Sequence, residues 1–190
     1  MTTYARPVAL DAGDEDIVVG YEAGAVVVHA LDGERIMTVD VDVASGAVVV
    51  RAADVDGDGV LDVVSAATED DTIAVYRASK GFSKRLAASD AVGVTDVVVL
   101  DVDGDGDLDL LPTLPCSGTV VALKSMPRNR EDDVWIGDDW LEYQRTVLRT
   151  RGRGQRAVAV VGDDVVVAYR TIYVHSGGKT ADAEVSTVDG

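Results

Sequence analysis

The sequence predicts an all-β protein, a β-propeller of about four four-stranded blades. The 190 residues include 36 Val, 19 Gly and only 4 Pro, and Val-rich runs broken by Gly and Asp are typical of β-strands. An order of apolar run, acidic turn, apolar run, short turn and apolar run recurs roughly every 45 residues, a period typical of propellers. The Val runs do not alternate with polar residues, so we expect both faces of those strands to be buried.

Four such units fill the chain as a single domain. Their approximate bounds are residues 5–45, 46–90, 91–150 and 151–190. Blades packed face to face around an axis bury both faces of their inner strands. The units form either a closed four-bladed ring or an open arc completed by oligomerisation, because a terminal repeat needs a neighbour to cover it. Of the two, we favour closure within one chain.

Each unit supplies its strands in the same order. The second unit predicts strands over residues 47–53, 63–67, 72–77 and 82–86. The third predicts strands over 96–100, 110–111 and 119–123, with a long tail to about residue 148. The first predicts strands over 7–10, 17–19, 25–30 and 35–39, and the fourth over 157–161, 165–169, 171–175 and 184–188. Units one and four have shortened acidic turns. Residues 138–149 can alternatively be interpreted as a short amphipathic helix.

Two acidic nonapeptides carry the strongest chemical signal. They read DVDGDGVLD at residues 54–62 and DVDGDGDLD at residues 101–109. Such crowded carboxylates repel one another unless a cation lies among them, and Ca²⁺ accepts six to eight oxygen ligands in a flexible shell. Gly59 and Gly106 stand where each loop must turn sharply. The expected ligands are side chains at positions one, three, five and nine and the carbonyl at position seven: Asp54, Asp56, Asp58, Val60, Asp62, Asp101, Asp103, Asp105, Asp107 and Asp109.

The loops are not EF-hands. An EF-hand loop requires a bidentate Glu at position twelve and flanking helices, whereas position twelve is Ser65 in one loop and Pro112 in the other. Apolar, strand-like residues follow both loops directly. Mg²⁺ is the alternative ion, although it demands stricter geometry and keeps more of its water.

The segments ADVDGDGVLDVV at 53–64 and LDVDGDGDLDLL at 100–111 resemble FG-GAP/VCBS repeats, the repeats of integrin α-chain propellers and many microbial surface proteins. The resemblance implies that each loop joins two strands of a blade and binds Ca²⁺ through its Asp side chains. It implies two calcium sites, and none in units one and four, which lack the nonapeptide. Propellers of this family usually have about seven blades, so the four units of this chain depart from the pattern.

The net charge of the chain limits the classes of molecule that we expect it to bind. With 34 Asp and Glu against 17 Lys and Arg, the net charge is −17, so we expect no binding to nucleic acid and no binding to anionic membranes. The two loops hold only nine of the 27 Asp, and an Asp-rich, Lys-poor chain is typical of proteins adapted to molar salt, where charges are screened within a few ångströms. We therefore expect a halophilic source. No run of apolar residues is long enough for a membrane helix, and the N-terminal residues do not resemble a signal peptide.

Two features in unit three and beyond are candidate partner contacts. An Arg-rich segment can clamp the carboxylates of an acidic neighbour, and a preceding insertion carries two Trp that can stack on sugars or on a protein. The expected partner-binding residues are Arg145, Arg149, Arg151, Arg153, Arg156, Trp135 and Trp140. The sequence as a whole contains no nucleophile elbow, phosphate-binding glycine loop or zinc-ligand spacing.

We therefore expect a non-enzymatic, calcium-stabilised structural or adhesion module whose partners are other subunits of an assembly. The expected setting is the virion of a virus that infects a halophile, as a structural or attachment protein, or the cytoplasm, with the extracellular surface as the alternative. Two other hypotheses remain: a carbohydrate-binding or carbohydrate-acting propeller, and a cytoplasmic scaffold that assembles through its Arg-rich segment.

Overall fold

The computed structural model describes residues 6–13, 16–32, 35–43, 48–117, 119–126, 143–150, 157–161, 164–168, 172–176 and 179–181. These residues are almost entirely strands and turns. Their only helical element is a three-residue 3-10 turn, η1 (Ala78–Lys80), so none of the described helical structure is long or apolar enough to cross a bilayer.

Sixteen described strands form four antiparallel sheets of four strands, each built from consecutive segments of chain. The first sheet contains β1 (Pro7–Ala12), β2 (Asp16–Tyr21), β3 (Ala25–Asp32) and β4 (Arg35–Val43). The second contains β5 (Val48–Ala53), β6 (Asp62–Ala67), β7 (Thr72–Arg77) and β8 (Ser83–Ala88). The third contains β9 (Asp96–Leu100), β10 (Asp109–Thr113), β11 (Thr119–Ser125) and β12 (Tyr143–Thr150). The fourth contains β13 (Ala157–Val161), β14 (Asp164–Ala168), β15 (Ile172–Ser176) and β16 (Lys179–Ala181).

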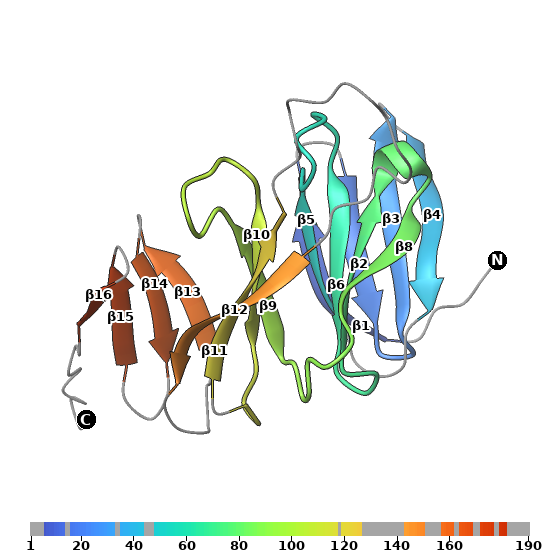
Figure 1. Ribbon diagram of the computed structural model, residues 1–190. Coiled ribbons are helices and arrows are strands. Elements are labelled where there is room, and N and C mark those ends of the chain that lie inside the picture. The colour runs from blue at the N-terminus through green and yellow to red at the C-terminus, as the bar shows by residue number, and fades with distance from the viewer. Residues whose placement is uncertain are drawn as a thin grey trace, which may run out of the picture.

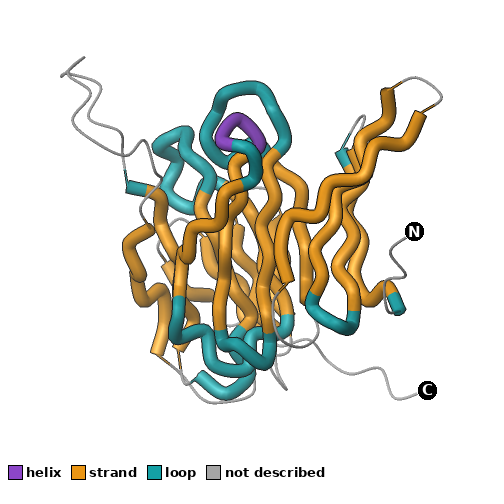
Figure 2. The backbone as a smooth tube through the Cα atoms, turned by 90° about the vertical axis from the view of Figure 1, so that its right-hand side faces the viewer, coloured by secondary structure: helices purple, strands orange, loops and turns teal. Residues whose placement is uncertain are grey.

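The sheets follow one another in a row, with the first sheet (blue) and the fourth (red-brown) at opposite ends (Figure 1). The first strand of each sheet lies against its neighbours: β1 contacts β5, β5 contacts β9, and β9 contacts β13. A ring closed within the chain, which the sequence favoured, is not seen among the described strands. The turns gather at the two ends of the strands, with η1 among those at one end (Figure 2).

Two apolar layers fill the spaces between the first three sheets. One layer joins Val18, Val26 and Val28 of the first sheet to Val50 and Tyr76 of the second. The other lies between the second and third sheets; its fully buried members include Val64, Ala66, Ile73, Val94, Val97 and Leu110. Alternate residues of β6 and β7 enter opposite layers, because successive side chains of a strand point to opposite faces. The second sheet is thus apolar on both faces, as its unbroken Val runs predicted.

Two sequence-based interpretations are wrong. The alternative of an amphipathic helix over residues 138–149 is wrong for residues 143–149, which belong to β12 and pair with β11 along its whole length; residues 138–142 lie outside the described residues. The chain has a single cysteine, Cys116, which the sequence predicts to be a small buried apolar residue; in the structure it is exposed. It lies in the turn after β10, where its Sγ approaches Gly93. The strand expected at residues 184–188 lies outside the described residues, whereas 179–181 form β16.

Candidate metal centre

The first acidic loop connects β5 to β6 and is shaped by glycines. Gly57 and Gly59 have φ values of 70° and 87°, in the left-handed region that a Cβ disfavours. The Asp54 carboxylate accepts hydrogen bonds from the backbone N–H groups of Asp58 at 3.0 Å and Gly59 at 2.9 Å. The chain therefore folds around the carboxylate of loop position one.

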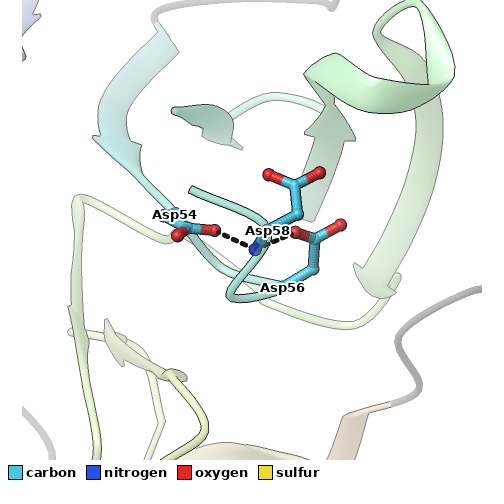
Figure 3. A group of neighbouring side chains, drawn as sticks. All are labelled: Asp54, Asp56 and Asp58. Carbon is cyan, nitrogen blue, oxygen red and sulfur yellow. Dashed lines mark hydrogen bonds between the residues drawn. The ribbon is translucent and has the colours of Figure 1, made fainter. Parts of the chain in front are cut away.

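Three carboxylates of this loop converge. Oxygen atoms of Asp54, Asp56 and Asp58 all lie within 4.8 Å of one another, and Figure 3 shows the three side chains around the turn. Asp58 is exposed, and a hydrogen bond from the Val60 N–H lowers the pKa of its carboxyl below the usual value. The lowered pKa favours the ionised form of the Asp58 carboxyl, and the cluster opens toward solvent at this residue.

The second loop, between β9 and β10, repeats the design. Gly104 and Gly106 have φ values of 77° and 92°, and their N–H groups donate to the Asp101 carboxylate at 2.7 and 2.9 Å. Here the converging carboxylates are Asp101, Asp103 and Asp109. The two triads share positions one and three and differ in the third member, which is position five in the first loop and position nine in the second.

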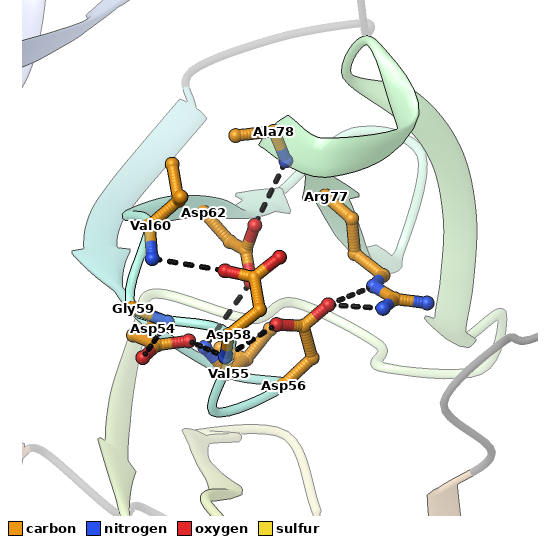
Figure 4. Close-up of polar contacts among 9 residues, drawn as sticks. All are labelled: Asp54, Val55, Asp56, Asp58, Gly59, Val60, Asp62, Arg77 and Ala78. Carbon is orange, nitrogen blue, oxygen red and sulfur yellow. Dashed lines mark hydrogen bonds and ion pairs between the residues drawn. The ribbon is translucent and has the colours of Figure 1, made fainter.

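The position-nine carboxylates hold each loop to its sheet. Asp62 is fully buried and accepts from the Val55 N–H at 3.2 Å and the Ala78 N–H at 2.8 Å (Figure 4). Asp109 is equally buried and accepts from the Val102 N–H at 3.0 Å and the Ser125 N–H at 2.7 Å. Each carboxylate thus ties the second loop residue to the end of the third strand.

Burial changes the protonation of these two groups. Loss of hydration disfavours a carboxylate, and it raises the pKa of Asp62 to about 6 and also raises the pKa of Asp109. The hydrogen bonds that each receives from backbone N–H groups act in the opposite direction. Burial outweighs those hydrogen bonds at both positions.

A basic side chain from the third strand of each sheet pairs with the position-three carboxylate. Arg77 at the end of β7 forms an ion pair with Asp56 (Figure 4), and the two side chains are only 5% and 0% exposed. Lys124 at the end of β11 donates to Asp103 at 2.8 Å, with the two side chains 26% and 33% exposed. Lys124 lowers the pKa of Asp103, and Asp103 raises that of Lys124. The first pair is sealed in the protein, whereas the second is open to water.

The residues of both loops fit Ca²⁺. Each triad offers only hard oxygen ligands at close range, and Ca²⁺ accepts such ligands in an irregular shell. Each of the ions would be held by the triad carboxylates, Asp54, Asp56 and Asp58 in one loop and Asp101, Asp103 and Asp109 in the other. The structure does not bring Asp62 or Asp105 into these triads, and the carbonyls of Val60 and Asp107 remain predicted ligands.

The candidate partner contacts are only partly described. Arg145 lies in β12 and forms an exposed ion pair with Asp90 of the same chain. Arg149 lies in the same strand. The remaining candidates lie outside the described residues: Arg151, Arg153, Arg156, Trp135 and Trp140.

Comparison with protein families decides what the paired loops are. The model of the family described as FG-GAP-like repeat matches residues 54–111, from the first residue of the first loop to the strand that follows the second. Residues 54–111 form an FG-GAP-like repeat. The FG-GAP-like repeat thus spans both loops and the strands between them, and its two acidic triads are consistent with the calcium sites that the resemblance implied.

The fold around the FG-GAP-like repeat has a counterpart among solved structures. The crystal structure of the computationally designed Ika4 protein matches with a TM-score of 0.59 at 16% sequence identity, covering 93% of this chain and 94% of that one. At this identity the likeness shows the fold alone. No curated protein sequence matches the chain significantly.

Sequence reasoning missed the two basic partners of the FG-GAP-like repeat loops. Arg77 and Lys124 each follow the position-three Asp of their loop by 21 residues. This equal spacing was visible in the sequence. It had no meaning there, because only the sheet topology brings the end of the third strand beside the loop between the first and second strands.

Proposed function

We propose that this chain is a non-enzymatic structural module, a β-propeller array whose sheets are the blades and whose two acidic loops each bind one Ca²⁺. The repeated carboxylate triad supports this proposal most directly, because two loops of one FG-GAP-like repeat gather carboxylate oxygens in the same manner. Bound calcium would offset the mutual repulsion of each triad and fix the loop to its sheet.

The test uses isothermal titration calorimetry. Calcium is first removed from the protein with a chelator, the chelator is removed, and calcium is then titrated back to count the ions that bind. We expect two ions for the unaltered chain, one for Asp58→Ala or Asp101→Ala, and none for the double variant. Glu69→Ala, which removes an exposed carboxylate in the turn between β6 and β7, serves as a charge-matched control and should retain both ions. Unchanged binding in the double variant would exclude the two triads as the sites.

Calcium should also stabilise the fold. An ion that binds only the folded state adds about 3–4 kcal/mol per site when its free concentration exceeds the dissociation constant a hundred- to a thousandfold. We expect chelation to lower the melting temperature of the unaltered chain and to leave that of the double variant unchanged.

Asp105→Ala distinguishes the predicted ligand set from the observed triad. If Asp105 is a ligand, the calcium affinity of the second loop falls; if the triad suffices, that affinity is retained.

We further propose that the module serves as a subunit of an assembly, in a virion or a cytoplasmic scaffold, in cells that maintain molar salt. The supporting observations are the net charge of −17 and strands that are apolar on both faces. Fractionation of a culture that produces the protein separates the two settings. Recovery with sedimenting particles after removal of the cells supports the virion, and recovery in the cytosol supports the scaffold.

A further inference from the structure

The first sheet has an apolar patch that no other described sheet covers. The exposed apolar residues of β1 are Val8, Leu10 and Ala12; Leu10 and Ala12 lie on one face of the sheet, and Val8 stands at a register shift beside them. Leu10 is 66% exposed and Val8 40% exposed. The opposite face of β1 packs on the second sheet: Ala9 joins the layer between the sheets, and Asp11 accepts a hydrogen bond from the Ala52 N–H at 2.9 Å. We call Val8, Leu10 and Ala12 the β1 patch.

The register of the sheets shows what normally covers such a position. The second strand of every sheet begins with an Asp: Asp16, Asp62, Asp109 and Asp164. The residue three places later lies opposite Leu10 in the first sheet, Val50 in the second and Val97 in the third. These three first-strand residues are therefore equivalent.

Their burial differs completely. Val50 is 0% exposed because it packs against the first sheet, and Val97 is 0% exposed because it packs against the second. Leu10, at the same position, is two-thirds exposed. The β1 patch is thus the surface that receives a preceding sheet elsewhere in the array; in the first sheet no described strand covers it, although Val19 and Val27, farther along the same face, are buried.

The fourth sheet carries the sequence that would fill this place. In the second sheet, the face that covers Val97 consists of Val64, Ala66, Ile73 and Val75. Register positions equivalent to these four in the fourth sheet hold Val166, Ala168, Ile172 and Val174. All four pairs are identical in residue type, and within each sheet the same two cross-strand pairs form, Val with Val and Ala with Ile. The fourth sheet therefore carries the same four residue types that cover Val97, the residue equivalent to Leu10.

We infer that a second copy of this chain docks on the β1 patch with its fourth sheet. The first and fourth sheets of one chain lie at opposite ends of the array (Figure 1), so the fourth sheet of a chain does not reach the β1 patch of the same chain in this arrangement. Two chains related by a two-fold axis cover both patches at once in a head-to-tail ring of eight sheets, in which no end remains. This inference names the partner in the proposed assembly and does not depend on calcium.

Light scattering after size exclusion tests the inference over a range of chain concentrations. Molar KCl is needed because two chains of net charge −17 repel each other at low salt. We expect a dimer for the unaltered chain. Leu10→Asp should raise the dimer dissociation constant at least about thirtyfold, because it removes a central apolar contact and buries a charge. Leu86→Asp, at a 48% exposed Leu of β8, is the matched control and should remain dimeric.

Hydrogen exchange identifies the second half of the interface. Compared with Leu10→Asp, the unaltered chain should exchange more slowly both in residues 7–12 and in residues 164–176. Protection of residues 7–12 alone would indicate that two first sheets pack on each other, and it would overturn the head-to-tail inference. A monomer at every concentration, or a dimer that Leu10→Asp leaves intact, would overturn it as well. None of these three results changes the number of calcium ions bound, so failure of this inference can be distinguished from failure of the proposed calcium-binding function.

Discussion

At the residue scale, the two basic residues beside the loops make similar contacts, but we expect their removal to lower the stability of the fold by different amounts. Arg77→Met leaves the Asp56 carboxylate buried without its cation, which should lower the free energy of unfolding by about 3–5 kcal/mol. Lys124→Met removes a pair that is partly exposed, and it should cost at most about 1 kcal/mol. Urea unfolding in chelator measures both. Equal costs would contradict the contrast in burial that the structure shows.

The same residues show the limits of the sequence at this scale. The spacing of Asp54, Asp56 and Asp58 was enough to predict a cation site, because short side chains on alternate loop residues converge wherever the loop turns. The role of Asp62 could not be read in this way. Its carboxylate is occupied by two backbone N–H groups, and the second belongs to Ala78, whose position depends on how three strands pair.

At the element scale, Asp62 and Asp58 are expected to stabilise different states of the loop. In chelator, Asp62→Ala should lower the free energy of unfolding by about 2–6 kcal/mol, because two N–H groups lose their acceptor at about 1–3 kcal/mol each. Asp58→Ala removes an exposed side chain and should change it by less than about 1 kcal/mol. With calcium present, both variants should be less stable than the unaltered chain. Thermal melts with and without calcium distinguish these patterns, and a large cost of Asp58→Ala in chelator would contradict them.

The strands themselves were largely predictable. Val-rich segments between Gly and Asp located most of them, and the loop nonapeptides fixed where β5, β6, β9 and β10 end or begin. The helical alternative fails at residues 143–149 for a physical reason. Tyr143, Val147 and Leu148 satisfy a helical spacing and a strand spacing alike, and only pairing with β11 decides between them.

At the scale of the whole molecule, the net charge of −17 should make stability depend on salt. Screening shortens from about 10 Å at 0.1 M salt to about 3 Å at 1 M, which weakens the repulsion among carboxylates across the surface. In chelator, the melting temperature should therefore rise as KCl is raised from about 0.1 M to molar concentrations. An equal osmolality of sucrose is the control for solvent exclusion. A melting temperature independent of KCl would argue against adaptation to high salt.

The overall arrangement was the least predictable level. The repeats indicated four units, but neither their number nor their composition states whether the first unit meets the fourth. That depends on the angle between successive sheets, which is set by the size of the side chains in each layer, such as Ile73 against Val97.

Each sheet is made of four strands that are consecutive among the described elements, and none of these strands is exchanged between sheets. During synthesis, every sheet can therefore complete its hydrogen bonding as soon as its own segment has left the ribosome, without waiting for the end of the chain. Stability should then grow by the addition of interfaces between neighbours. A gene that duplicated or lost one such segment would lengthen or shorten the array without breaking a single strand pairing.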